Sequence, residues 1–96
     1  MEIKDMTVEQ LEQAIAEKQA EAAELKEKRL KLEPAFLKLT RQTLVMKKRG
    51  NMSECERLKA ESHALSERMT GMHEKEVEAE DFILEAKERI AELNEG

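Results

Sequence analysis

"LVMKKRGNMSECERL", residues 44–58, decides the fold because it reads as the junction between two helices. Three consecutive cations at 47–49 suit the C-terminal end of a helix, where the helix dipole favours positive charge. The Gly-Asn pair at 50–51 suits the left-handed backbone that ends a helix. Ser53, followed three residues later by Glu56, matches a capping box that starts the next helix. The chain is therefore predicted to turn here.

Apolar residues recur at steps of three and four on both sides of this junction. Nine of twelve positions are apolar in the first series, and ten of twelve are apolar or small in the second. This is the heptad pattern of helices that pack side by side, and a disordered segment would not keep its phase over so many residues. We call these positions the seam: Val8, Leu11, Ile15, Lys18, Ala22, Leu25, Arg29, Leu32, Phe36, Leu39, Thr43 and Met46, then Cys55, Leu58, Ser62, Leu65, Met69, Met72, Glu76, Ala79, Ile83, Ala86, Ile90 and Leu93.

The seam predicts an all-α, antiparallel two-helix coiled-coil hairpin, because a loop this short forces the helices to run in opposite directions. We expect one domain, residues 1–96, with helices at about 8–49 and about 54–93. Thr7 and Gln10 form a second candidate capping box. Pro34 should kink the first helix, since proline has no N–H and clashes with the preceding turn. Gly71 weakens the second helix, so a shared bend, a break into four shorter helices and a hinge are all open.

A second apolar row lies one step off the seam. Leu30, Leu37 and Leu44 recur every seven residues, and Val45 adds to them. A lone two-helix hairpin would leave this row in water, and an exposed apolar row usually marks a contact surface. We therefore expect these four residues to form the interface of a homo-oligomer, most simply a two-fold dimer that makes a four-helix bundle. A different protein could cover the row instead.

Charge is sorted along the chain, although 41% of all residues are charged and the net charge is only −5. Residues 28–50 carry a formal charge of +7, whereas residues 1–27 and 71–96 carry −5 and −6. In a hairpin both acidic stretches fall at the open end. The helix dipole accounts for the three bases at the end of the first predicted helix. It does not account for the five bases at 28–41, two to five turns earlier, and this excess indicates a charged partner. The expected partner-binding residues are Lys38, Arg41, Lys47, Lys48 and Arg49.

The sequence offers little catalytic chemistry. His63 and His73 lie on different flanks of the second predicted helix, no glycine-rich phosphate loop occurs, and His73 with Glu76 would give a metal too few ligands. We expect no enzyme, cofactor or metal site.

Cys55 is expected to pack in the seam as a small apolar group. With one cysteine, no long apolar run and no signal-like N-terminus, we expect a cytoplasmic protein that does not enter a membrane.

These features favour a non-enzymatic protein-binding helical module, such as an adaptor, a chaperone-like protein or an inhibitor, that acts as a homo-oligomer. One alternative is a nucleic-acid-binding arm that uses the basic turn half, although aromatic residues for base stacking are only 2%. A structural coiled-coil rod is another, and the acidic open end could bind a basic, DNA-receiving site on another protein. Helical hairpins with basic tips occur in tRNA-binding arms and prefoldin-like chaperones, a likeness of fold without a shared motif.

Overall fold

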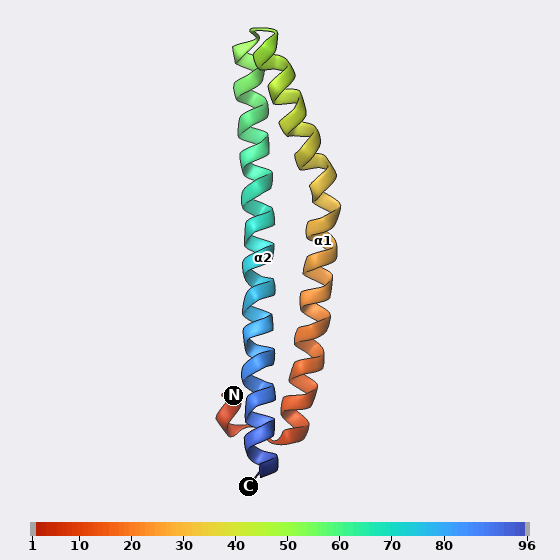
Figure 1. The fold of residues 1–96 in the computed structure, drawn as a ribbon, viewed down its shortest axis with the longest axis vertical. Coiled ribbons are helices and arrows are strands. Elements are labelled where there is room, and N and C mark those ends of the chain that lie inside the picture. The colour runs from red at the N-terminus through yellow and green to blue at the C-terminus, as the bar shows by residue number, and fades with distance from the viewer. Residues whose placement is uncertain (1, 96) are drawn as a thin grey trace. The chain divides into compact units, whose positions relative to one another are not determined.

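The computed structural model describes residues 2–95 and contains two long helices that pack antiparallel as a hairpin (Figure 1). A short 3₁₀ turn, η1 (Ile3–Asp5), precedes α1 (Val8–Lys48) and α2 (Met52–Glu95). The predicted all-α, two-helix fold is therefore confirmed. The predicted bounds of the first helix are right to within one residue at its C-terminal end, and α2 begins two residues earlier and ends two residues later than expected.

The turn ends α1 with two hydrogen bonds of the Schellman type. The Gly50 N–H donates to the Lys47 carbonyl at 3.1 Å, and the Asn51 N–H donates to the Met46 carbonyl at 3.0 Å. Gly50 has a φ of +74°, the left-handed conformation that a side chain disfavours. The prediction for Gly50 is confirmed. Asn51 is not left-handed, because no described residue other than glycine has a positive φ.

Asn51, and not Ser53, caps the start of α2. Its Oδ1 accepts a hydrogen bond from the Glu54 N–H at 3.2 Å, while its carbonyl accepts the first helical bond from Cys55 at 3.0 Å. The predicted capping box at Ser53 and Glu56 is therefore wrong. Both Asn and Ser cap helices well, and Asn51 comes first after the glycine, so the helix starts as soon as the chain has turned.

The start of α1 follows the predicted capping box. The Thr7 N–H donates to Gln10 Oε1 at 2.9 Å, and the Gln10 N–H donates to Thr7 Oγ1 at 3.2 Å. Met6 packs against the apolar cluster that contains Leu11. A residue just before the cap that meets the fourth helical residue is a hydrophobic staple, which fixes the direction in which the chain enters the helix.

The seam predicted from the heptads is the buried line of both helices. Every seam residue is buried or half-buried except Leu93, which lies in the last turn of α2 and is exposed. Cys55 is fully buried, and its thiol lies 3.7 Å from the Thr43 carbonyl, so the prediction that it packs in the seam is confirmed. The polar seam position Glu76 is also buried.

Pro34 lies inside α1 without ending it, and α2 continues through Gly71. The break into four shorter helices is therefore wrong. Pro34 and Leu30 are both exposed. The Leu30 carbonyl, which loses its helical partner at the proline, is thus beside water that can take the place of the missing N–H. The kink at Pro34 stays a prediction, and it does not interrupt the helix.

The chain divides into two compact units. Unit 1 consists of Met1–Lys26 and Glu74–Gly96, and unit 2 is Glu27–His73. Unit 1 holds a cluster of buried apolar side chains, Leu11, Ile15, Ile83 and Ala86, against which Ile3, Met6, Phe82 and Ile90 also pack. Its N-terminal segment folds back beside the end of α2, where Arg89 Nη2 donates to the Lys4 carbonyl at 3.4 Å (Figure 1). A third piece of chain thus helps to cover this core.

Lys18, a polar interruption of the seam in unit 1, is half-buried without leaving its charge in the core. Its Nζ lies 3.1 Å from Glu21 Oε2 and 5.8 Å from the centroid of the Phe82 ring. The aliphatic stem covers apolar surface while the ammonium stays near an acid and an aromatic face.

Replacing Asn51 tests the cap. Asn51→Ala removes the side-chain acceptor for the Glu54 N–H and is expected to cost about 1 kcal/mol of unfolding free energy. Asn51→Asp keeps the acceptor and serves as the control. Urea unfolding followed by circular dichroism measures both, and equal stability of the alanine and aspartate variants would contradict the assignment of the cap.

Candidate protein-binding surface

The four residues predicted as an oligomer interface all lie on the exposed side of α1 in unit 2. Leu30, Leu37 and Leu44 are 45%, 64% and 55% exposed, and Val45 is 38% exposed. Large apolar side chains in water at this spacing form a continuous row, because seven residues correspond to nearly two helical turns. Val45 lies roughly 80° around the helix from Leu37, at the flank of the row. The structure thus brings the predicted residues together on one face.

Unit 2 has a thinner core than unit 1. Cys55 and Leu58 are buried, but the apolar seam residues of α1 in this unit, Leu32, Phe36, Leu39 and Met46, are only half-buried. Two helices alone can enclose just the side chains along the line of contact. A partner over unit 2 would therefore cover both the exposed row and part of the seam.

A shallow groove of about 380 Å³ runs between the two helices of unit 2. It is lined by Phe36, Thr40, Thr43, Leu44, Lys59, Ser62, His63 and Ser66. The hydroxyl groups of Thr40 and Thr43 donate to carbonyls of the preceding turn of α1, at 3.0 and 2.8 Å. With their hydroxyls bonded to their own helix, these threonines have little need of water. The apolar lining of the groove, Phe36 and Leu44, lies on α1, whereas α2 contributes the polar residues Lys59, Ser62, His63 and Ser66.

Sequence reasoning identified the row of leucines but missed the groove. Phe36, Thr43 and Ser62 were recognised only as seam positions, and Thr40 and Ser66 carried no signal of their own. Small residues at helical spacing on the flanks of both heptad series are the signal that could have found the groove. It becomes visible once two helices are placed side by side.

The five predicted partner-binding cations are all exposed. Within residues 2–95, none of Lys38, Arg41, Lys47, Lys48 and Arg49 has a carboxylate within ion-pairing distance. Unit 2 holds eleven basic and six acidic residues, a formal charge of +5, whereas unit 1 holds six basic and sixteen acidic residues, a charge of −10. Unit 2 therefore presents an unneutralised positive field around the apolar row.

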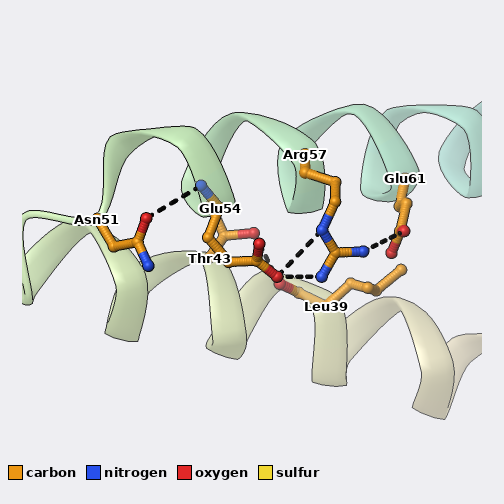
Figure 2. A network of polar contacts seen from close by, with 6 residues as sticks. All are labelled: Leu39, Thr43, Asn51, Glu54, Arg57 and Glu61. Carbon is orange, nitrogen blue, oxygen red and sulfur yellow. Dashed lines mark hydrogen bonds and ion pairs between the residues drawn. The ribbon is translucent and has the colours of Figure 1, made fainter.

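Two carboxylates of unit 2 are paired with an arginine of the same helix, α2 (Figure 2). Arg57 lies between Glu54 and Glu61, donating from Nε to Glu54 Oε1 at 3.0 Å and from Nη1 to Glu61 Oε1 at 2.8 Å. These charge-assisted bonds hold the pKa of Glu54 below its usual range and raise that of Arg57. Two of the three carboxylates of α2 closest to the turn, Glu54 and Glu61, are thus engaged on their own helix and do not neutralise the cations of α1.

The described residues form no cluster of side chains that could hold a metal ion. Residues 2–95 contain no group of three or more His, Cys, Asp or Glu side chains arranged to hold an ion. His63 Nε2 lies 3.1 Å from Glu67 on the neighbouring turn. No helix formed by these residues combines the length and the apolar character that crossing a bilayer requires.

Comparison with known proteins identifies no relative: no family model, no curated protein and no solved structure matches the chain.

The lowered pKa of Glu54 predicts a pH dependence. Because the folded pKa lies below the ordinary value of about 4.3, the carboxylate stabilises the fold above that value, and the contribution is lost as the pH falls through the lowered pKa. Glu54→Gln should therefore have a lower Tm than the wild type at pH 6 and approach it at pH 3.

The matched control is Glu56→Gln, which removes an exposed carboxylate two residues away. Thermal unfolding followed by circular dichroism gives the difference in Tm at each pH. A Glu54→Gln difference that stays constant from pH 6 to pH 3 would contradict the role of the ion pair.

Proposed function

We propose that this protein is a non-enzymatic, protein-binding helical module that acts as a homo-oligomer, with the row of Leu30, Leu37, Leu44 and Val45 as its contact surface. The observation that carries the proposal is the exposure of this row beside a half-buried seam. An adaptor, a chaperone-like protein and an inhibitor all use such a surface. The buried free thiol of Cys55 fits a reducing, cytoplasmic setting.

Magnitudes limit what the row can do alone. Fully burying a leucine stabilises by about 1.5–3 kcal/mol, and these leucines are roughly half exposed, so covering each returns on the order of 1 kcal/mol. Association costs an estimated 4–15 kcal/mol in lost freedom. The three leucines and Val45 therefore need a partner that also covers the groove at Phe36 and Thr40. A helical partner has the shape for both.

Charge then selects the partner more than it strengthens the contact. Exposed ion pairs contribute roughly 0–1 kcal/mol each, but like charges brought together across an interface are rejected. The unpaired cations Lys38, Arg41, Lys47, Lys48 and Arg49 favour an acidic protein surface over a neutral or basic one.

Substituting the most exposed leucine tests the proposal. Leu37→Glu places a charge in the centre of the row and is expected to convert the protein into a monomer, because the carboxylate would be buried at the interface. Gln42→Glu adds the same charge to an exposed position on the same helix and is the matched control. Sedimentation velocity at tens of micromolar compares them. A wild type that sediments as a monomer would refute homo-oligomerisation.

A second candidate function is a nucleic-acid-binding arm, favoured by the same unpaired cations next to the turn. Unit 1 carries −10 and the chain has no Trp or Tyr, which weighs against it. We expect no mobility shift of DNA or RNA at 150 mM salt.

Nucleic-acid binding would instead give a shift that weakens steeply with salt. Reversing residues 47–49 to Glu would remove that shift, whereas reversing Lys26, Lys75 and Lys87 of unit 1 would leave it. Gel mobility assays with both triple variants separate the two functions.

A further inference from the structure

A second exposed apolar row lies on α2 in unit 1. Val77 and Leu84 are 41% and 60% exposed, and Ala91 continues the row at the same seven-residue spacing. An exposed carboxylate follows each of the three by four residues, on the same side of the helix. We call these six residues the acidic stripe: Val77, Asp81, Leu84, Glu88, Ala91 and Glu95.

The row on α1 in unit 2 has the same spacing of apolar residues, and its charged residues have the opposite sign. Each of its leucines is followed four residues later by an exposed proline or cation. These six residues form the basic stripe: Leu30, Pro34, Leu37, Arg41, Leu44 and Lys48. Four charged residues of the two stripes have no oppositely charged side chain within ion-pairing distance among residues 2–95: Arg41, Lys48, Asp81 and Glu88.

We propose that the basic stripe of one copy docks on the acidic stripe of a second copy of this chain. The proposal rests on the proposed function, in which the leucine row binds protein, and it names the surface that the row binds. Pairing unit 2 with unit 2 would bring two surfaces of +5 together, whereas unit 2 on unit 1 brings +5 against −10. Charge complementarity therefore selects the unlike pair.

The two stripes match position by position when the helices run parallel with an offset of 47 residues. Leu37 then meets Leu84 in the middle, with Leu30 opposite Val77 and Leu44 opposite Ala91. Both rows have apolar residues about 10.5 Å apart, because each step is seven residues at 1.5 Å. The same offset places Arg41 at the level of Glu88 and Lys48 at the level of Glu95.

Charge reversal on each stripe tests the pairing. Arg41→Glu with Lys48→Glu makes both stripes of a chain acidic, and Glu88→Lys with Glu95→Lys makes both basic. Each double variant alone is expected to associate at least about tenfold more weakly than the wild type, because its stripes repel. An equimolar mixture of the two should associate again, since each stripe then meets its opposite. The chain with all four changes should also self-associate.

Sedimentation velocity measures all of these samples, and circular dichroism confirms that each remains helical. Glu12→Lys with Glu17→Lys reverses two exposed carboxylates of α1 in unit 1, outside the acidic stripe, and should leave association unchanged. Raising the salt concentration should weaken wild-type association, as screening acts on exposed charges.

The outcomes separate this inference from the proposed function. If Leu37→Glu prevents association but Glu88→Lys with Glu95→Lys does not, the leucine row binds protein and the acidic stripe is not its partner. If the two double variants fail to associate when mixed, the pairing is likewise wrong. If the wild type is a monomer at tens of micromolar, homo-oligomerisation fails, and this inference fails with it.

Discussion

Two helices can bury only the side chains along the line where they meet, and this constraint shapes the rest of the molecule. Unit 1 overcomes it by adding a third piece of chain, because Ile3 and Met6 fold over the cluster around Leu11. Unit 2 has no such cover among the described residues, and its seam on α1 stays half-buried. The exposed leucines of α1 are a consequence of the same limit, since a helix pair has no inner face left to receive them.

The charge pattern follows a similar division. Acids and bases on one helix pair with each other over one turn, as Lys31 does with Glu27 and Arg57 with Glu54 and Glu61. Such local pairs neutralise neighbours but leave the sum of each unit unchanged. Unit 2 keeps an excess of cations and unit 1 an excess of carboxylates. Surface ion pairs contribute little to folding, so this sorting has more bearing on association than on stability.

The features that depend on neighbours in sequence could be predicted from the sequence. Heptad spacing predicted the seam. The short signals at Thr7 and Gly50 predicted the start of α1 and the turn, because helix caps involve residues only a few positions apart. The exposure of Leu37 followed from its place outside the seam.

Features that depend on distant contacts could not be predicted. Ile3 belongs to no repeat, and the contact from Lys4 to Arg89 joins residues 85 positions apart. The start of α2 was misplaced because Asn51 and Ser53 are both good caps, and only the backbone of the turn selects between them. The groove beside Phe36 needs two helices in register before it exists.

Asn51 serves two helices at once: its N–H closes α1 and its side chain and carbonyl open α2. The connection therefore has no residue that is not bonded to one of the two helix ends. A single inserted or deleted residue within a helix would shift every seam position beyond it by about 100° around the helix axis. A change in chain length that leaves the seam in phase therefore adds or removes whole heptads in both helices together. A tag or reporter domain inserted at residues 49–51 would separate two helix ends that share one residue.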